Sequence, residues 1–160
     1  MSLDIETLRA KAEAGSKVSQ VILGIALLHG YGCSPDYEGA LRWLVPAVER
    51  GVPRARVNLG IMYERGLGVA VDIDRARELY EAGARSGEFF GCIYLARLLV
   101  SGRCGSIAKR AAVRWYGEAV GLPYDAAFSV VSSSLTTALA ATTPGGVPQS
   151  KTHILSPSIL

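Results

Sequence analysis

The chain repeats itself every 36 residues. The stretch from Leu23 to Gly51 realigns without a gap on the stretch from Leu59 to Gly87. A further step of the same length reaches a weaker third copy, in which Gly102, Ala112 and Tyr116 match Gly66, Ala76 and Tyr80. A repeat of this length is typical of one supersecondary unit whose apolar face is buried by the next copy. The period therefore predicts a solenoid of stacked units.

The middle unit reads as two helices joined by a glycine turn. Pro53 stands where the first helix begins, and apolar residues then follow at helical spacing. Gly66 and Gly68 supply the turn, and Asp72 is predicted to be the N-cap of the second helix. Glycine recurs inside the first helix, as Gly24 and Gly60, which indicates close approach by a neighbouring helix backbone.

Composition shifts divide the chain into four predicted parts. Residues 1–15 form an N-terminal capping helix that resembles a half-unit, and residues 16–122 form the solenoid. The third unit carries Ala108 where the first two carry a capping Asp. Residues 123–141 form a C-terminal capping helix that covers the open end of the stack. Residues 142–160 contain three prolines and two glycines, which favours a flexible tail.

Charge and hydropathy exclude several classes of partner. The net charge is +3, and the 13 Arg and 4 Lys are spread through the repeats. A nucleic-acid-binding protein would gather basic residues into a stripe, so we expect no nucleic acid. No apolar stretch approaches the ~20 residues that span a bilayer, and no basic and apolar leader opens the sequence. We therefore expect no membrane span and a cytoplasmic location.

The reactive side chains do not form a catalytic or metal-binding pattern. Cys33, Cys92 and Cys104 follow no repeating spacing and no CxxC motif, so we expect three reduced and mostly buried thiols. The place of Cys92 on a first helix, equivalent to Arg56, leaves partial exposure of this thiol open. His29 lies at the end of a first helix and His153 lies in the tail, which argues against a catalytic pair. The sequence predicts no catalytic residue, no metal and no cofactor.

The segment from Ala55 to Ala76 follows the pattern A-x-x-x-L-G-x-x-Y-x-x-G-x-G-V-x-x-D-x-x-x-A. This pattern resembles the Sel-one-like (Sel1-like) repeat, a relative of the tetratricopeptide repeat. The resemblance implies an all-α fold: an α/α right-handed superhelical solenoid of about three helix pairs with terminal capping helices. It also implies a non-enzymatic scaffold or adaptor that binds a protein or peptide through its concave face. Many members are bacterial.

The resemblance places candidate binding residues on the first helices, which line the concave face. It implies that Asn58 hydrogen-bonds an extended peptide backbone, and its equivalents one period away are Ile22 and Tyr94. The next exposed turns carry Ile61, Arg97 and Arg65. The predicted groove is thus apolar at its N-terminal end and cationic toward its middle and far end.

Two alternative functions are left open. A secreted, cysteine-rich branch with a disulfide in each repeat includes proteins reported to bind penicillin-like compounds, which suggests small-molecule binding or β-lactam hydrolysis. Here the cysteines do not recur at the repeat spacing, which disfavours this alternative. The second alternative is a structural protein that self-assembles into homo-oligomers through the solenoid ends, because three units are near the minimum for a continuous core.

Overall fold

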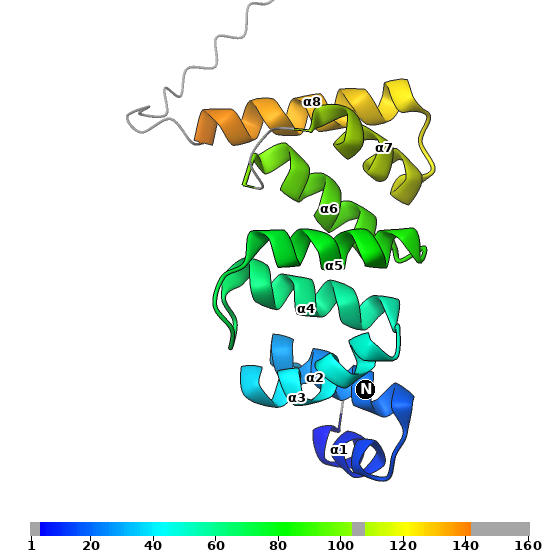
Figure 1. The fold of residues 1–160 in the computed structure, drawn as a ribbon, viewed down its shortest axis with the longest axis vertical. Coiled ribbons are helices and arrows are strands. Elements are labelled where there is room, and N and C mark those ends of the chain that lie inside the picture. Colours follow the sequence, from blue (N-terminus) through cyan, green and yellow to red (C-terminus); the bar gives the residue numbers. More distant parts are fainter. Residues whose placement is uncertain (1–3, 104–107, 142–160) are drawn as a thin grey trace, which may run out of the picture.

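The chain folds into a stack of helices (Figure 1). The computed structural model describes residues 4–103 and 108–141, with side chains through Ser132. Within these residues the elements are α1 (Ile5–Glu13), α2 (Lys17–His29), α3 (Tyr37–Glu49), α4 (Pro53–Arg65), α5 (Ile73–Arg85), α6 (Phe89–Ser101), α7 (Lys109–Val120) and α8 (Tyr124–Ala141). Each is an α-helix, so the described part of the chain is all-α. The last helix, Tyr124–Ala141, lies within residues 123–141.

The helices pack in the order of the chain, from α1 at one end to α8 at the other (Figure 1). The three predicted pairs are α2 with α3, α4 with α5, and α6 with α7. First helices of neighbouring units also touch, α2 with α4, α4 with α6, and α6 with α8. This arrangement confirms the predicted solenoid and places the first helices in one contiguous row.

The turn within each unit is built in the same way. The first helix ends at a glycine in the left-handed conformation, at Gly30, Gly66 and Gly102. The second helix begins with an Asp side chain that accepts from a backbone N–H of its first turn, 2.8 Å away for both Asp36 and Asp72. These contacts confirm the predicted caps. Ala108 takes the same place in the third unit and offers no side-chain cap.

The glycines inside the first helices make room for side chains, which corrects our expectation of a backbone contact. A Cβ on Gly60 would lie 2.7 Å from the ring of Tyr80, and a Cβ on Gly24 would lie 2.9 Å from the side chain of Leu44. Close backbone approach occurs instead between α5 and α6. A Cβ on Gly91 would lie 2.6 Å from the amide nitrogen of Ala84 and 2.9 Å from the carbonyl carbon of Gly83.

A hydrogen bond that involves an arginine joins the two helices of the first unit and again those of the second, but the arginine stands at a different one of the two positions in each unit. In the first unit, Arg50 Nη2 donates to Gln20 Oε1 at 3.0 Å. In the second unit, Arg56 Nη1 donates to Ser86 Oγ at 3.1 Å. Arg56 stands one period after Gln20, and Ser86 stands one period after Arg50. The arginine therefore lies on the second helix in one unit and on the first helix in the next.

The core runs through the stack as three overlapping clusters of buried residues. The first joins α1 to α5, the second joins α4 to α7, and the third joins α6 to α8. Cys92 is buried in the second cluster, in agreement with the expectation of mostly buried thiols, and the partial exposure left open for it does not occur. Burial raises the pKa of this thiol. None of the described helices is both long enough and apolar enough to cross a bilayer. The predicted tail, residues 142–160, lies outside the described residues.

Candidate partner-binding groove

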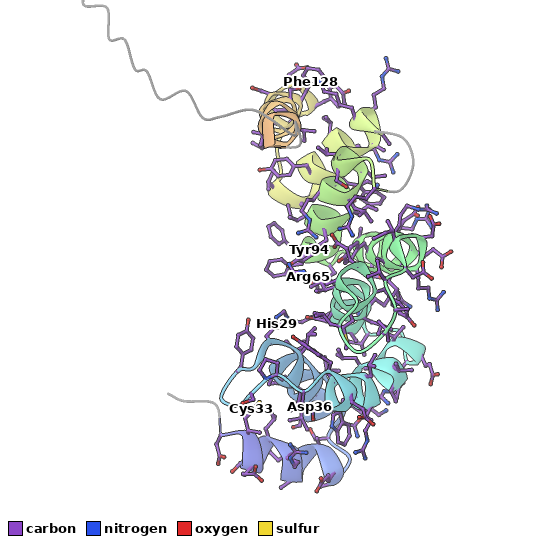
Figure 2. The ribbon with its side chains drawn as sticks, turned by 90° about the vertical axis from the view of Figure 1, so that its left-hand side faces the viewer. His29, Cys33, Asp36, Arg65, Tyr94 and Phe128 are labelled. Atoms are coloured by element: carbon purple, nitrogen blue, oxygen red, sulfur yellow. The ribbon has the colours of Figure 1, made fainter. Side chains whose placement is uncertain are left out.

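A cavity of about 210 Å³ lies across the first helices of all three units. Figure 2 shows His29 of the first unit and Tyr94 of the third on the same side of the stack. The lining comes from α2 and the turn after it, from α4, and from the start of α6: Ile25, His29, Tyr31, Arg54, Val57, Asn58, Ile61, Glu88, Phe90 and Tyr94. Three of the predicted binding residues, Asn58, Tyr94 and Ile61, therefore meet in one place.

Asn58 is only 7% exposed and is held on both sides of its amide. Its Nδ2 donates to the backbone oxygen of Arg54 at 2.8 Å, and its Oδ1 lies 3.1 Å from Nε2 of His29. A side-chain amide carries two N–H groups, and these contacts use one of them. The second remains available to a carbonyl oxygen that enters the cavity.

Tyr94 forms a half-buried aromatic wall of the cavity. Its ring stacks on Tyr80, with centroids 5.4 Å apart, and the guanidinium of Arg97 lies 4.8 Å from its centroid on the exposed side. Ile61 is 3% exposed, so the position that we expected to be an exposed turn forms the floor of the cavity. Its buried place follows from the second core cluster, in which it packs with Tyr80 and Leu95.

The other three predicted residues do not line this cavity. Ile22 and Arg65 are exposed, and Arg97 lies at its edge against Tyr94. Ile22 is 41% exposed on α2, in the register that Asn58 and Tyr94 occupy on α4 and α6. Ile22, Asn58 and Tyr94 thus occupy equivalent positions on the three first helices, but only Asn58 and Tyr94 line the cavity.

A buried carboxylate that sequence reasoning missed stands beside this row. Glu64 is 6% exposed and accepts from Tyr80 Oη at 2.7 Å, from Arg97 Nη2 at 2.6 Å and from Arg103 Nη1 at 2.9 Å. Arg103 also donates to the backbone oxygen of Glu64. Burial, and then the hydrogen bond to this carboxylate, raise the pKa of Tyr80. Glu64 therefore ties the second unit to the third.

A comparison of equivalent positions in the three units could have predicted this cluster. One period before Glu64 stands Leu28, and one period after it stands Val100, both buried and apolar. A charged residue at a position that is apolar in the neighbouring units predicts a local polar partner. Its partners Arg97 and Arg103 likewise replace Ile61 and Leu67 of the unit before.

The family model of the Sel1 repeat matches residues 18–52 and 53–88, which are the first and second of these units. Residues 18–88 are two Sel1 repeats. Sel1 repeats form helical solenoids and are typically protein-interaction modules.

Relatives and solved structures agree with this family. Protein sel-1 homolog 2 of mouse is 38% identical over 73 residues, and its human counterpart is 36% identical over the same length. These matches cover 45% of this chain and 11% of each relative, so the matched stretch corresponds to about a ninth of their length.

Two crystal structures share the fold. A Sel1 repeat protein from Oxalobacter formigenes has a TM-score of 0.62 and 30% identity, over 73% of this chain and 48% of that one. The protective antigen c5321 of uropathogenic Escherichia coli, which has an SLR fold, has a TM-score of 0.66 and 24% identity, over 89% of this chain and 34% of that one. The second comparison shows the fold alone.

The lining residues that we did not predict include Arg54, Phe90, Glu88 and Tyr31. Arg54 and Phe90 are exposed at the same position of consecutive units, four residues before Asn58 and Tyr94. Because residues four apart on a helix share a face, this row could have been read from the period. Glu88 precedes α6 without capping it, and Tyr31 stacks on His29, with centroids 5.3 Å apart.

The lining suits recognition of a polypeptide. Arg54 and Asn58 offer donors, Glu88 offers a carboxylate, and three aromatic rings offer flat apolar surface. In the described ranges, 4–103 and 108–141, no three His, Cys, Asp or Glu side chains gather as they would around a metal ion. Cys33 and Cys92 are free thiols, unlike the paired cysteines of the disulfide-containing branch.

A second cavity of about 310 Å³ lies one 36-residue period further along the stack, between α6, α7 and α8. Ile93, Arg97 and Val130 line it, and they stand 36 residues after Val57, Ile61 and Tyr94 of the first cavity. The two cavities therefore share three equivalent positions in consecutive units. The remaining lining of the second cavity is mainly apolar: Ala96, Val100, Ser101, Tyr116 and Val131.

Proposed function

We propose that this protein is a non-enzymatic interaction scaffold that binds an extended segment of a partner protein along the first helices of its repeats. The observation that carries the proposal is the cavity shared by α2, α4 and α6. Its donors and carboxylate lie beside exposed aromatic rings, the combination that fixes a peptide backbone and takes up its side chains.

In this proposal the residues first expected to bind have different roles. Asn58 supplies one N–H to a backbone carbonyl of the partner and uses its other groups to hold Arg54 and His29 in place. Tyr94 supplies a ring face. Arg54 and Phe90, at the exposed rim, supply most of the new contact area. Ile61 supports them from below.

The exposed rim offers a sharper test than the deeper residues, because Asn58, Tyr94 and Arg97 also hold the fold together. We would select binding peptides from a phage-displayed random 12-residue library with the full chain. Affinities would be measured by fluorescence polarisation for the wild type, for Arg54→Glu and for Phe90→Ser. We expect each substitution to weaken binding by about tenfold or more, since buried aromatic and Arg anchors dominate interfaces.

Phe89→Ser is the matched control. Phe89 and Phe90 are neighbours with similar exposure, 47% and 52%, and their rings contact each other, but only Phe90 lines the cavity. Phe89→Ser should therefore keep most of the affinity. A selection that enriches no peptide over an immobilised control protein, or peptides that bind Phe90→Ser as well as the wild type, would refute the proposal.

A further inference from the structure

Arg97 connects the two cavities. It contacts the ring of Tyr94, which lines the first cavity, and it lines the second. In the preceding units its place is taken by Ile25 and Ile61, both buried. The exchange of an isoleucine for an arginine at this one repeat position gives the second cavity a cationic rim above an apolar floor.

The charge at this rim is not balanced by the neighbouring side chains. Arg97 and Arg103 share the single carboxylate of Glu64, and their side chains are 46% and 47% exposed. Within 4.0 Å of either guanidinium, the described residues supply no other carboxylate. A guanidinium has five N–H donors, and each arginine directs only one or two of them to Glu64. Two arginines and one glutamate together carry a net charge of about +1, and the remaining N–H groups of the two guanidiniums can donate to a bound anion.

We propose, resting on the function proposed above, that the partner segment carries an acidic side chain next to an apolar one. The carboxylate of the Asp or Glu pairs with Arg97, and the apolar side chain enters the second cavity against Val100, Val130 and Val131. Charge complementarity selects this occupant over a basic or neutral one, because an anion at Arg97 completes the pairing that Glu64 leaves unfinished.

The repeat also sets where this acidic residue lies in the segment. Neighbouring helices in contact have axes about 8–10 Å apart, so consecutive cavities are separated by about one such step. An extended chain advances about 3.3 Å per residue. The apolar residue that enters the second cavity is therefore expected about three residues away from the side chain that contacts Phe90 and Tyr94, and the acidic residue that pairs with Arg97 lies between the two.

The test compares the peptides selected by the wild type with those selected by Arg97→Gln. Wild-type selections should be enriched in an Asp or Glu flanked by Leu, Ile, Val or Phe. Changing the acidic residue of a selected peptide to Asn or Gln should weaken wild-type binding by about tenfold, the size of a charge-assisted hydrogen bond. Arg97→Gln should bind the two peptides equally well. Val130→Glu, which places a carboxylate at the apolar side of the second cavity, should reject the acidic peptide.

Arg75→Gln is the matched control, because it removes the same charge from an exposed pair with Glu78 on α5. It should retain the acidic preference. Circular dichroism of each variant confirms that it is folded. Enriched peptides without an acidic preference, or an unchanged preference in Arg97→Gln, would overturn this inference while leaving the proposed scaffold function intact. The absence of any enriched peptide would instead overturn the proposed function and this inference with it.

Discussion

At the scale of single residues, Glu64 bears most on how the units are joined. It is a buried carboxylate whose oxygens accept from one tyrosine and two arginines, and the arginines belong to the following unit. Removing one member of such a cluster leaves the others with desolvated and unpaired groups. The half-exposed guanidiniums can regain water, so the cost is smaller than for a fully buried pair.

We therefore expect Glu64→Gln to lower the free energy of unfolding by about 1–3 kcal/mol. Urea unfolding followed by circular dichroism measures the change. Glu78→Gln is the matched control, because Glu78 pairs with Arg75 on the exposed surface of α5. It should cost less than about 0.5 kcal/mol. Equal effects of the two substitutions would show that the Glu64 cluster does not stabilise the junction.

Tyr80 gives the protein a predictable response to alkaline pH. Burial and the hydrogen bond to Glu64 raise the pKa of its phenol, whereas an unfolded tyrosine ionises near pH 10. The unfolded state therefore loses this proton first. The contribution of Tyr80 to stability is complete below about pH 10 and is lost as the pH rises further, at about 1.4 kcal/mol per pH unit.

We expect Tyr80→Phe to lose stability less steeply than the wild type above pH 10. The measurement is the free energy of urea unfolding between pH 8 and pH 11. Below pH 10 the variant should be less stable by about 1–2 kcal/mol, because Glu64 loses a donor. Parallel pH profiles for the two proteins would contradict the assignment.

At the scale of helices, α5 and α6 approach closely enough for backbone contact at Gly91. The pair Gly83 and Gly91 occupies the places of Ala47 and Ala55 in the preceding unit, where each residue carries a methyl group. A methyl group on Gly91 would meet backbone atoms of α5, whereas one on Gly83 would meet the end of the Val57 side chain, 2.9 Å away. Backbone atoms cannot move aside as a side chain can.

Gly91→Ala should therefore destabilise the protein by about 1–3 kcal/mol, and Gly83→Ala by clearly less. Thermal unfolding of the two variants beside the wild type measures the difference. Each substitution also gains some helix propensity, which works against the clash equally in both. A Gly83→Ala variant less stable than Gly91→Ala would argue against the backbone contact.

The helices and turns were predictable because their causes are local. The turn glycines and the caps Asp36 and Asp72 act within a few residues of their own position, and the period repeats them. The groove was predictable only in part. Asn58, Ile61 and Tyr94 meet as expected, but the depth of Ile61 and the cluster around Glu64 depend on side chains that meet across units. The period identifies equivalent positions in the units, but it does not say which side chains contact one another there.

At the scale of the whole molecule, the stack ends in α8, which among the described elements packs only on α7 and α6. In a solenoid each unit is stabilised by its neighbours, so an end with a neighbour on one side only opens before the middle. The Glu64 cluster opposes this opening because it fastens the third unit to the second.

Native-state hydrogen exchange should show this gradient. Amides of α7 and α8 are expected to exchange faster than those of α3 and α4. Glu64→Gln should speed exchange further in α6 and α7 and leave α2 unchanged. Uniform protection along the chain, or a loss of protection in Glu64→Gln that reaches α2 equally, would mean that the stack opens as one unit.

The contact between Gln20 and Arg50, and its exchanged counterpart between Arg56 and Ser86, bears on how faithfully similar units find their own partners. Repeat proteins misassemble when a helix pairs with the counterpart of its proper neighbour. If α4 took the place of α2 beside α3, Arg56 would face Arg50, and two positive charges would meet where one hydrogen bond belongs. The alternation of arginine between the two helices thus distinguishes each unit, and it disfavours the exchange of structurally equivalent helices while the chain folds.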